Sequence, residues 1–263
     1  MLFHVKPRVV AVVNQKGGVG KTTTTISLGA TLAAYEHPTL LVDLDPQGNC
    51  TNGLGHEPKP DALTAYEVIT GRADLGSATR VTEFPHLSLV PATPDLAGAE
   101  VELVGMVGRE FRLREALEDV TSTRFVVVDC PPSLGLLTVN ALAAADSLLV
   151  PIQCEYFAME GVSNLLRTVD EVRRFLNPEL AIDGFLLTMY DDRTNLARQV
   201  AAEVRRVFGD LVFETVVPRN VRLAEAPSFG RPIHAYDLRS TGAQAYLRLG
   251  REYLERTGVR HAG

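Results

Sequence analysis

The sequence has little cysteine and no long apolar run. Its three cysteines, Cys50, Cys130 and Cys154, are odd in number and widely spaced, without a C-x-x-C pair. This pattern argues against a disulfide framework or a zinc site and fits a reducing cytosol. No apolar run approaches the roughly 18 residues that span a bilayer. The apolar run after residues 1–8 breaks at Asn14, so we expect neither a membrane span nor a signal peptide.

Lysine is scarce as well, and the sequence as a whole is acidic. Only four of the 26 basic residues are lysines, and two of them, Lys16 and Lys21, fall within one six-residue window. The net charge of −6 argues against a nucleic-acid partner for the molecule as a whole. From Tyr190 to the end, however, 12 arginines face 9 aspartates and glutamates. The late part of the chain can therefore still carry a basic surface.

Length and patterning favour a single α/β domain. A chain of 263 residues is enough for one large domain and somewhat long for two independent ones. Strand and helix patterns alternate along it without an internal repeat or a low-complexity linker, which predicts a mostly parallel sheet with helices on both faces. We expect one domain over residues 1–263, with a short N-terminal arm at 1–8 and a frayed tail at 257–263.

The apolar patterns locate the individual elements. Apolar runs predict strands at residues 9–13, 39–45, 86–90, 125–129, 147–152, 182–188 and 212–217. Helical spacing predicts helices at residues 24–35, 62–69, 96–101, 112–120, 162–176, 196–207 and 242–256. Residues 49–60 are expected to form a polar, glycine-bearing connection.

The most informative stretch is a glycine-rich loop between the first strand and the first helix. Strand, loop and helix in this order form the context of a phosphate-binding loop, whose N–H groups and helix dipole attract negative charge. Lys21 would reach the β- and γ-phosphates, and the Thr22 hydroxyl would hold Mg²⁺. The alternative is a solvated turn in which Lys21 merely caps the helix. The predicted nucleotide-binding residues are Lys16, Gly17, Gly18, Val19, Gly20, Lys21, Thr22 and Thr23.

The loop departs from the pattern G-x-x-x-x-G-K-[ST] at one position. Gln15 stands where the pattern has glycine, and a second lysine, Lys16, follows it. Two lysines on one small loop repel each other unless they face additional negative charge. We therefore expect Lys16 to face an anion of its own.

Three carboxylates follow buried strands. Asp43 and Asp45 end the second strand, and Asp129 ends the strand at 125–129. In α/β sheets ligands gather at the carboxyl ends of the strands, so these acids are expected beside the glycine loop. Asp129 would hold Mg²⁺, and Asp43 would support the same Mg²⁺ shell. The alternative for Asp43 and Asp45 is a pair of acids that cap a turn before Pro46.

These motifs resemble those of one family. K-G-G-V-G-K-T-T at 16–23, D-L-D-P-Q at 43–47 and D-C-P-P-S-L-G at 129–135 are similar to motifs of the ParA/MinD ATPases, most of all the chromosome-partitioning ParA (Soj) branch. The resemblance runs from about residue 9 to about residue 254. It implies a P-loop NTPase fold of the deviant Walker A (SIMIBI) type and an ATPase that uses ATP and Mg²⁺. It also implies that Lys16 contacts nucleotide across a homodimer interface and that Asp45 orients the attacking water.

The same resemblance implies further contacts and partners. It assigns adenine to Pro218, Arg219 and Asn220, and non-specific double-stranded DNA to Arg193 and Arg222. It implies an ATP-dependent homodimer, a ParB-like protein that stimulates hydrolysis, and a cytoplasmic, nucleoid-associated location without membrane binding. Without the resemblance, an ordinary strand-ending turn explains residues 218–220 equally well, and surface arginines more often do nothing specific.

Two other functions use the same loop. A MinD-like ATPase in division-site placement ends in a basic amphipathic helix that lies on lipid, whereas residues 246–256 mix acids among the arginines. An iron–sulfur reductase-type ATPase needs two cysteines per subunit for a bridging cluster, and neither Cys130 nor Cys154 lies in the expected context. The sequence leaves open whether the cargo is a chromosome or a plasmid.

Overall fold

The computed structural model describes residues 6–156 and 158–259, with the backbone alone at residue 158. Residues 1–5 of the expected arm and 260–263 of the expected tail lie outside the described residues. Arg8, expected in the arm, is the first residue of strand β1 (Arg8–Val12). Thr257, expected in the tail, is the last residue of helix α12 (Thr241–Thr257). Regular structure therefore reaches slightly further at both ends than the sequence suggested.

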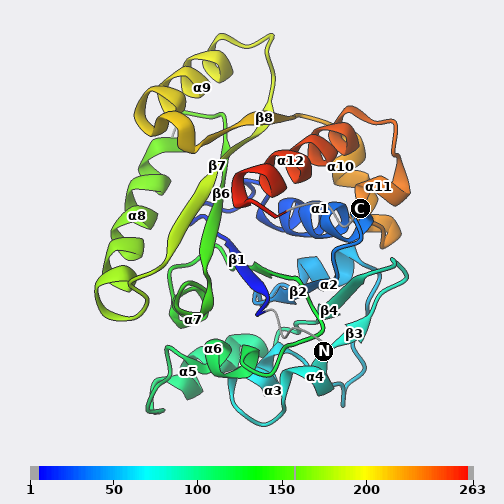
Figure 1. Ribbon diagram of the computed structural model, residues 1–263, viewed down its shortest axis with the longest axis vertical. Helices are drawn as coiled ribbons and strands as arrows, with labels where there is room; N and C mark the ends of the chain where they lie inside the picture. The colour runs from blue at the N-terminus through cyan, green and yellow to red at the C-terminus, as the bar shows by residue number, and fades with distance from the viewer. Residues whose placement is uncertain (1–5, 157, 260–263) are drawn as a thin grey trace.

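One sheet runs through the middle of the molecule (Figure 1). In the described part of the chain it has eight strands in the order β3-β4-β2-β5-β1-β6-β7-β8, and β3 alone runs antiparallel to its neighbour. The mostly parallel α/β sheet that the sequence predicted is confirmed. Besides β1, the strands are β2 (Thr39–Asp43), β3 (Arg80–Val81), β4 (Leu87–Val90), β5 (Phe125–Asp129), β6 (Ser147–Gln153), β7 (Ala181–Tyr190) and β8 (Val212–Pro218).

Helices cover both faces of the sheet, as Figure 1 shows for α1 and α12 on one side and α8 on the other. The first face carries α12 together with α1 (Lys21–Ala34), α2 (Asn49–Gly53), α10 (Val221–Glu225), η2 (Ala226–Phe229) and α11 (Ile233–Tyr236). The second face carries α3 (Ala65–Ile69), α4 (Leu75–Ala78), α5 (Leu96–Leu103), α6 (Arg112–Leu117), α7 (Leu136–Ala144), α8 (Ala158–Phe175) and α9 (Asn195–Phe208). No helix of the described residues is long and apolar enough to cross a membrane.

Two apolar cores hold these layers together. In β1, Val10 and Val12 belong to the core beneath α1 and α12, whereas Val9 and Ala11 belong to the core beneath α7 and α8. Successive side chains of a strand point to opposite faces, so burial of both faces requires nearly continuous apolar strands. This explains why the apolar runs in the sequence were reliable guides to the central strands.

Several short elements were not expected. Helix α2 occupies the start of the 49–60 stretch that we expected to be a connection, and α4, α7, α10 and α11 have no counterpart among the predicted helices. In α7 all residues but Thr138 and Asn140 are apolar, so it lacks the amphipathic period that identifies a surface helix. Strand β3 has two residues, too few for an alternating pattern.

A close backbone approach joins two distant loops on the first face. A Cβ atom added to Gly230, which follows η2, would lie 2.6 Å from the Cα of Gly55, which follows α2. Both glycines have positive φ angles, of 62° and 72° respectively, which other residues rarely adopt. The end of α2 is therefore packed directly against η2.

Candidate nucleotide-binding site

The glycine loop is anchored to strands β6 and β7. Asn14, two residues after the end of β1, donates its side-chain amide to the Pro151 carbonyl at 2.7 Å, and its Oδ1 accepts the Lys16 N–H at 3.0 Å. The Thr188 hydroxyl of β7 donates to the Val19 carbonyl at 2.8 Å. Contacts from two neighbouring strands thus fix the loop at the carboxyl edge of the sheet.

Lys21 opens α1 and is almost wholly buried. Its Nζ donates to the Lys16 carbonyl at 3.3 Å, and burial lowers the pKa of the ammonium group, which the charge of Asp129 partly opposes. Before it, Gly18 and Gly20 have φ angles of 74° and 88°, a conformation that favours glycine, and because glycine has no side chain the loop is open where an anion would approach. A buried ammonium bonded to one carbonyl is well suited to receive phosphate oxygens.

The Asp129 carboxylate lies at the same edge. In the parallel pairing of β2 with β5, Asp43 stands opposite Asp129, and the Thr25 hydroxyl of α1 donates to Asp129 Oδ1 at 3.1 Å. Burial, reinforced by the charge of Asp43, raises the pKa of Asp129 to about 8, while the Thr22 and Thr25 hydroxyls oppose the shift. Among the described residues, Asp129 Oδ2 is a buried oxygen without a hydrogen-bond partner. Such an oxygen next to a hydroxyl fits the oxygen donors that Mg²⁺ prefers.

Asp43 and Asp45 have different surroundings, although one residue separates them. Asp43 is fully buried and accepts hydrogen bonds from Asp45 N at 3.1 Å, Thr51 N at 2.9 Å and the Thr51 hydroxyl at 2.7 Å. Burial raises the pKa of Asp43 to about 6 against the effect of those bonds. Asp45 accepts the Gln47 N–H at 3.0 Å and lines the cavity in front of the glycine loop.

A cavity of about 590 Å³ lies between the glycine loop and α2. Its described lining includes the loop residues Gly17, Gly18, Gly20, Lys21, Thr22 and Thr23, and opposite them Asp45, Gln47, Asn49, Asn52 and Gly53. We call it the phosphate cavity. Lys16 is not part of this lining, because its Nζ lies 3.1 Å from Glu155 Oε2, on the connection after β6. The two lysines of the loop are thus directed to different places.

A second, largely apolar cavity of about 440 Å³ continues from the first. The two share Gly20, Thr23, Met189, Leu223 and Ala224. The continuation, which we call the base cavity, is also lined by the predicted adenine residues Pro218, Arg219 and Asn220. The Asn220 side chain is engaged within the chain, since it accepts Arg222 N at 2.8 Å and donates to the Thr241 hydroxyl at 2.7 Å. Together the cavities form a trough with a charged end and an apolar end.

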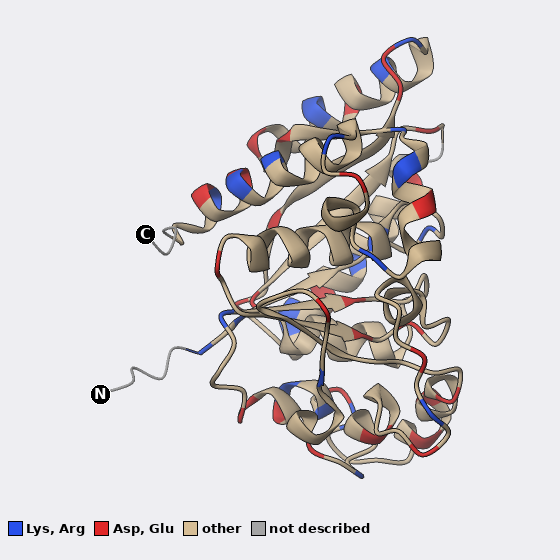
Figure 2. Cartoon of the chain, turned by 90° about the vertical axis from the view of Figure 1, so that its right-hand side faces the viewer, with Lys and Arg blue, Asp and Glu red and all other residues tan. Residues whose placement is uncertain are grey.

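The two predicted DNA arginines lie outside this trough and are already paired. Arg193 donates to both carboxylate oxygens of Asp191, at 2.8 and 2.7 Å, and this bonding holds the pKa of Asp191 down at about 2. Arg222 pairs with Glu225 at 2.8 Å and with Asp237 at 3.6 Å. Their side chains are 84% and 50% exposed. More generally, Figure 2 shows acidic and basic residues interleaved along the helices rather than segregated.

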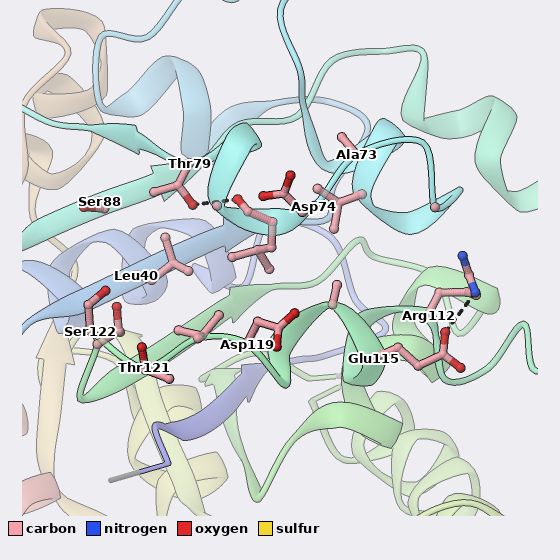
Figure 3. A pocket seen from close by; sticks show the side chains of 17 residues that line it. Leu40, Ala73, Asp74, Thr79, Ser88, Arg112, Glu115, Asp119, Thr121 and Ser122 are labelled. Carbon is pink, nitrogen blue, oxygen red and sulfur yellow. Dashed lines mark hydrogen bonds and ion pairs between the residues drawn. The ribbon is translucent and has the colours of Figure 1, made fainter. Parts of the chain in front are cut away.

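A third cavity, of about 610 Å³, lies at the amino-terminal ends of the strands, opposite to the glycine loop (Figure 3). Leu40 lines it from the start of β2, and Asp74 and Asp119 line it from above and below in the view of Figure 3. The Arg112 charge is paired with Glu115 at 2.8 Å. Since its remaining charges are acidic, this cavity repels phosphates and does not compete with the trough as a nucleotide site.

All three cysteines are buried. Cys50 and Cys130 are fully enclosed, and Cys154 is 6% exposed. Burial raises the pKa of Cys154 to about 11 and those of the other two above their usual value. Buried, protonated thiols are poor ligands for an iron–sulfur cluster shared between subunits.

Four polar contacts of the site were not foreseen from the sequence. They involve Thr25 with Asp129, Thr51 with Asp43, Glu155 with Lys16, and Thr188 with the glycine loop. Thr25 lies one helical turn after Lys21, and that spacing could have identified it. The other contacts join residues of separate elements, so no local sequence pattern predicts them.

Comparison with known proteins gives consistent relatives. A family model described as an AAA domain matches residues 7–182. The chain is 55% identical over 250 residues to the chromosome partitioning protein ParA of Myxococcus xanthus, covering 95% of this chain and 88% of that protein. It is 53% identical over 246 residues to the sporulation initiation inhibitor protein Soj of Bacillus subtilis, covering 93% and 97%.

A solved structure is similar over nearly the whole chain. It is named cobyrinic acid a,c-diamide synthase from Mycobacterium smegmatis and was crystallised with bound ADP and magnesium. The two chains superpose with a TM-score of 0.84 and 40% sequence identity, over 97% of each.

Proposed function

Because the chain belongs to the ParA/Soj family of chromosome-partitioning ATPases, we propose that it acts as an ATP-dependent switch on DNA. With ATP bound in the trough, two subunits associate face to face and the dimer binds double-stranded DNA without sequence preference. Hydrolysis, stimulated by a ParB-like partner, separates the subunits and releases the DNA. In this scheme the protein works in the cytoplasm on the nucleoid.

The direction of Lys16 carries this proposal. Lys21 lines the phosphate cavity of its own subunit, whereas Lys16 is held by Glu155 away from that cavity. A second lysine on the loop needs an anion, and the triphosphate of a facing subunit provides one. Glu155 compensates the charge of Lys16 until that anion arrives.

The acids of the site then take separate tasks. Thr22 and Asp129 would hold Mg²⁺, which would neutralise phosphate charge. Asp45, one of the cavity's lining residues, orients the water for in-line attack on the γ-phosphate. Lys21 binds the β- and γ-phosphates, and the 218–220 turn holds adenine in the base cavity.

Two observations speak against the other functions of this loop. The apolar residues of α12, among them Tyr246, Leu249 and Tyr253, are buried in the core beneath α1, so this helix has no apolar face to lay on lipid. The buried cysteines do not fit a shared iron–sulfur cluster. Neither a lipid surface nor a redox partner is therefore part of the proposal.

Sedimentation on DNA tests the whole scheme. Wild-type protein is mixed with DNA of unrelated sequences, with ATP, with ADP and without nucleotide, at two salt concentrations. We expect co-sedimentation with ATP alone, equal for all sequences and much weaker at the higher salt. Binding to anionic vesicles instead of DNA would favour the MinD-like function.

Lys16→Ala tests the dimer directly. It should keep monomeric ATP binding, because Lys16 does not line its own phosphate cavity, yet lose ATP-dependent dimerisation in analytical ultracentrifugation. Lys59→Ala, at an exposed position, is the matched control and should dimerise normally. A Lys16→Ala protein that still dimerises with ATP contradicts the cross-subunit role.

A further inference from the structure

We propose that Asp43 is a positioning residue that fixes the segment 45–53 over the phosphate cavity, and not a ligand of Mg²⁺. The inference rests on the proposed function, since it gives Asp43 a task in the hydrolysis carried out at Asp45. It departs from the expectation, drawn from the sequence, that Asp43 supports the Mg²⁺ shell.

The contacts of Asp43 span that segment from end to end. Its Oδ1 accepts the N–H of Asp45, where the segment begins, and its Oδ2 accepts both the N–H and the hydroxyl of Thr51 in α2. The carboxylate and the Thr51 side chain are both fully buried. One side chain therefore holds both the catalytic acid's backbone and the helix that follows it.

Asp43 supplies the cap that α2 lacks. The N-cap residue of α2 is Gly48, which has no side chain to accept a hydrogen bond from the first turn. Thr51 is the third residue of this helix, the position whose N–H an N-cap side chain ordinarily bonds. A carboxylate at a helix N-terminus is also favoured by the helix dipole. Asp43 thus performs from strand β2 the task of a local capping residue.

Thr51 extends the anchor to a second strand. Its hydroxyl donates to Asp43 and also accepts the N–H of Ala92 at 2.9 Å, just beyond β4. Helix α2 is thereby tied to the carboxyl ends of two neighbouring strands. Asn49, Asn52 and Gly53 of α2 line the phosphate cavity opposite the glycine loop, so the anchor sets the position of that wall.

The contrast with Asp129 separates an anchor from a ligand. Three protein hydrogens already bond the two oxygens of Asp43, whereas Asp129 Oδ2 has no such partner among the described residues. A metal bound to Asp43 would have to share an oxygen with the hydrogen bonds that hold Asp45 or α2 in place. Asp129 Oδ2 could bind a metal without giving up a hydrogen bond to any described residue.

Thr51→Val tests the anchor, because it removes the hydroxyl and nearly keeps the shape. We expect kcat for ATP to fall about tenfold, since the water-orienting segment loosens, while the dissociation constant for ATP stays within about twofold. Thr51→Ser restores the hydroxyl and should restore kcat. Thr39→Val is the matched control: it removes another buried hydroxyl, at the start of β2, which is bonded to the His37 carbonyl at 2.9 Å, and it should leave kcat unchanged.

Asp43→Asn and Asp129→Asn test the metal. We expect Mg²⁺ to strengthen ATP binding of Asp43→Asn as it does for wild type, and to have little effect on Asp129→Asn. Loss of the Mg²⁺ effect in Asp43→Asn, or unchanged kcat in Thr51→Val, overturns the inference. If Asp45→Ala turns over ATP like wild type, the hydrolysis mechanism under Proposed function fails instead, whatever Thr51→Val does.

Discussion

The buried charged groups beside the glycine loop and the two arginines predicted to contact DNA differ in burial and in pairing. Lys21 and Asp129 are buried, and each keeps capacity for a ligand: one ammonium on a single carbonyl, one carboxylate oxygen without a partner among the described residues. Arg193 and Arg222 are exposed and paired, Arg193 with Asp191 of its own turn, and Arg222 with Glu225 of α10 and with Asp237 after α11.

This difference in burial decides how much free energy is lost when one charged group is removed. Buried charges interact in a low dielectric, so removing one partner leaves the other uncompensated at a large cost. Exposed pairs are screened by water and salt, and they exchange partners at little cost. We therefore expect large effects on ATP binding and turnover from substitutions of the buried groups, and salt-dependent effects confined to DNA binding from substitutions of the two arginines.

Lys21→Ala should give the largest effect and is the strongest test of the buried charged groups. Loss of the main cation on the phosphates lowers ATP affinity by about 100-fold or more. Titration with a fluorescent ATP analogue measures it, with Lys59→Ala as the control. ATP affinity like that of wild type would show that ATP binding at the glycine loop does not depend on the buried lysine.

Asp45→Ala tests a second acid of the phosphate cavity and separates ATP binding from ATP hydrolysis. We expect turnover to fall about 100-fold because the attacking water is no longer oriented, whereas ATP affinity and dimerisation persist. Turnover is measured with DNA and the ParB-like partner present. Unchanged turnover transfers the catalytic role to another residue.

Arg193→Glu combined with Arg222→Glu tests the two exposed arginines. ATP binding and dimerisation should be intact, since neither arginine lines the trough, while DNA binding is lost. Each phosphate contact removed lowers the slope of log affinity against log salt by about one unit, and a dimer loses up to four. DNA affinity equal to that of wild type would make both arginines ordinary solvated residues.

Asp191→Asn should give the smallest effect, in the opposite direction. It frees Arg193 from its paired acid, so DNA affinity should rise about two- to fivefold, the range of one exposed ion pair. Glu203→Gln, which frees Arg206 from a similar pair at 2.6 Å, controls for net charge. Equal gains in both variants would mean that Arg193 has no special position toward DNA.

The sequence was sufficient where local pattern and tertiary structure agree. Central strands are apolar because both faces are buried, so β1, β2 and β5 were predicted close to their bounds, with Asp43 and Asp129 at their ends. The glycine loop was recognisable because the strand before it, the positive-φ glycines and the helix after it all belong to one short stretch.

The sequence was insufficient where structure depends on distant partners. Helix α2 has five residues and a glycine N-cap, so nothing local stabilises it, and the carboxylate that caps it belongs to β2. Helix α7 is buried and shows no amphipathic period. The pairing of Lys16 with Glu155, across the connection after β6, could not be read from either residue alone.

The contact between Gly55 and Gly230 constrains how this protein can change. A side chain at position 230 would collide with the backbone of Gly55, and both positions need positive φ angles. Pro227 and Ser228 of η2 line the phosphate cavity together with residues of α2. These two walls are therefore fixed against each other, and neither glycine can acquire a side chain unless the other loop moves aside. An engineer who grafts a new segment after β2 must redesign the turn at Gly230 as well.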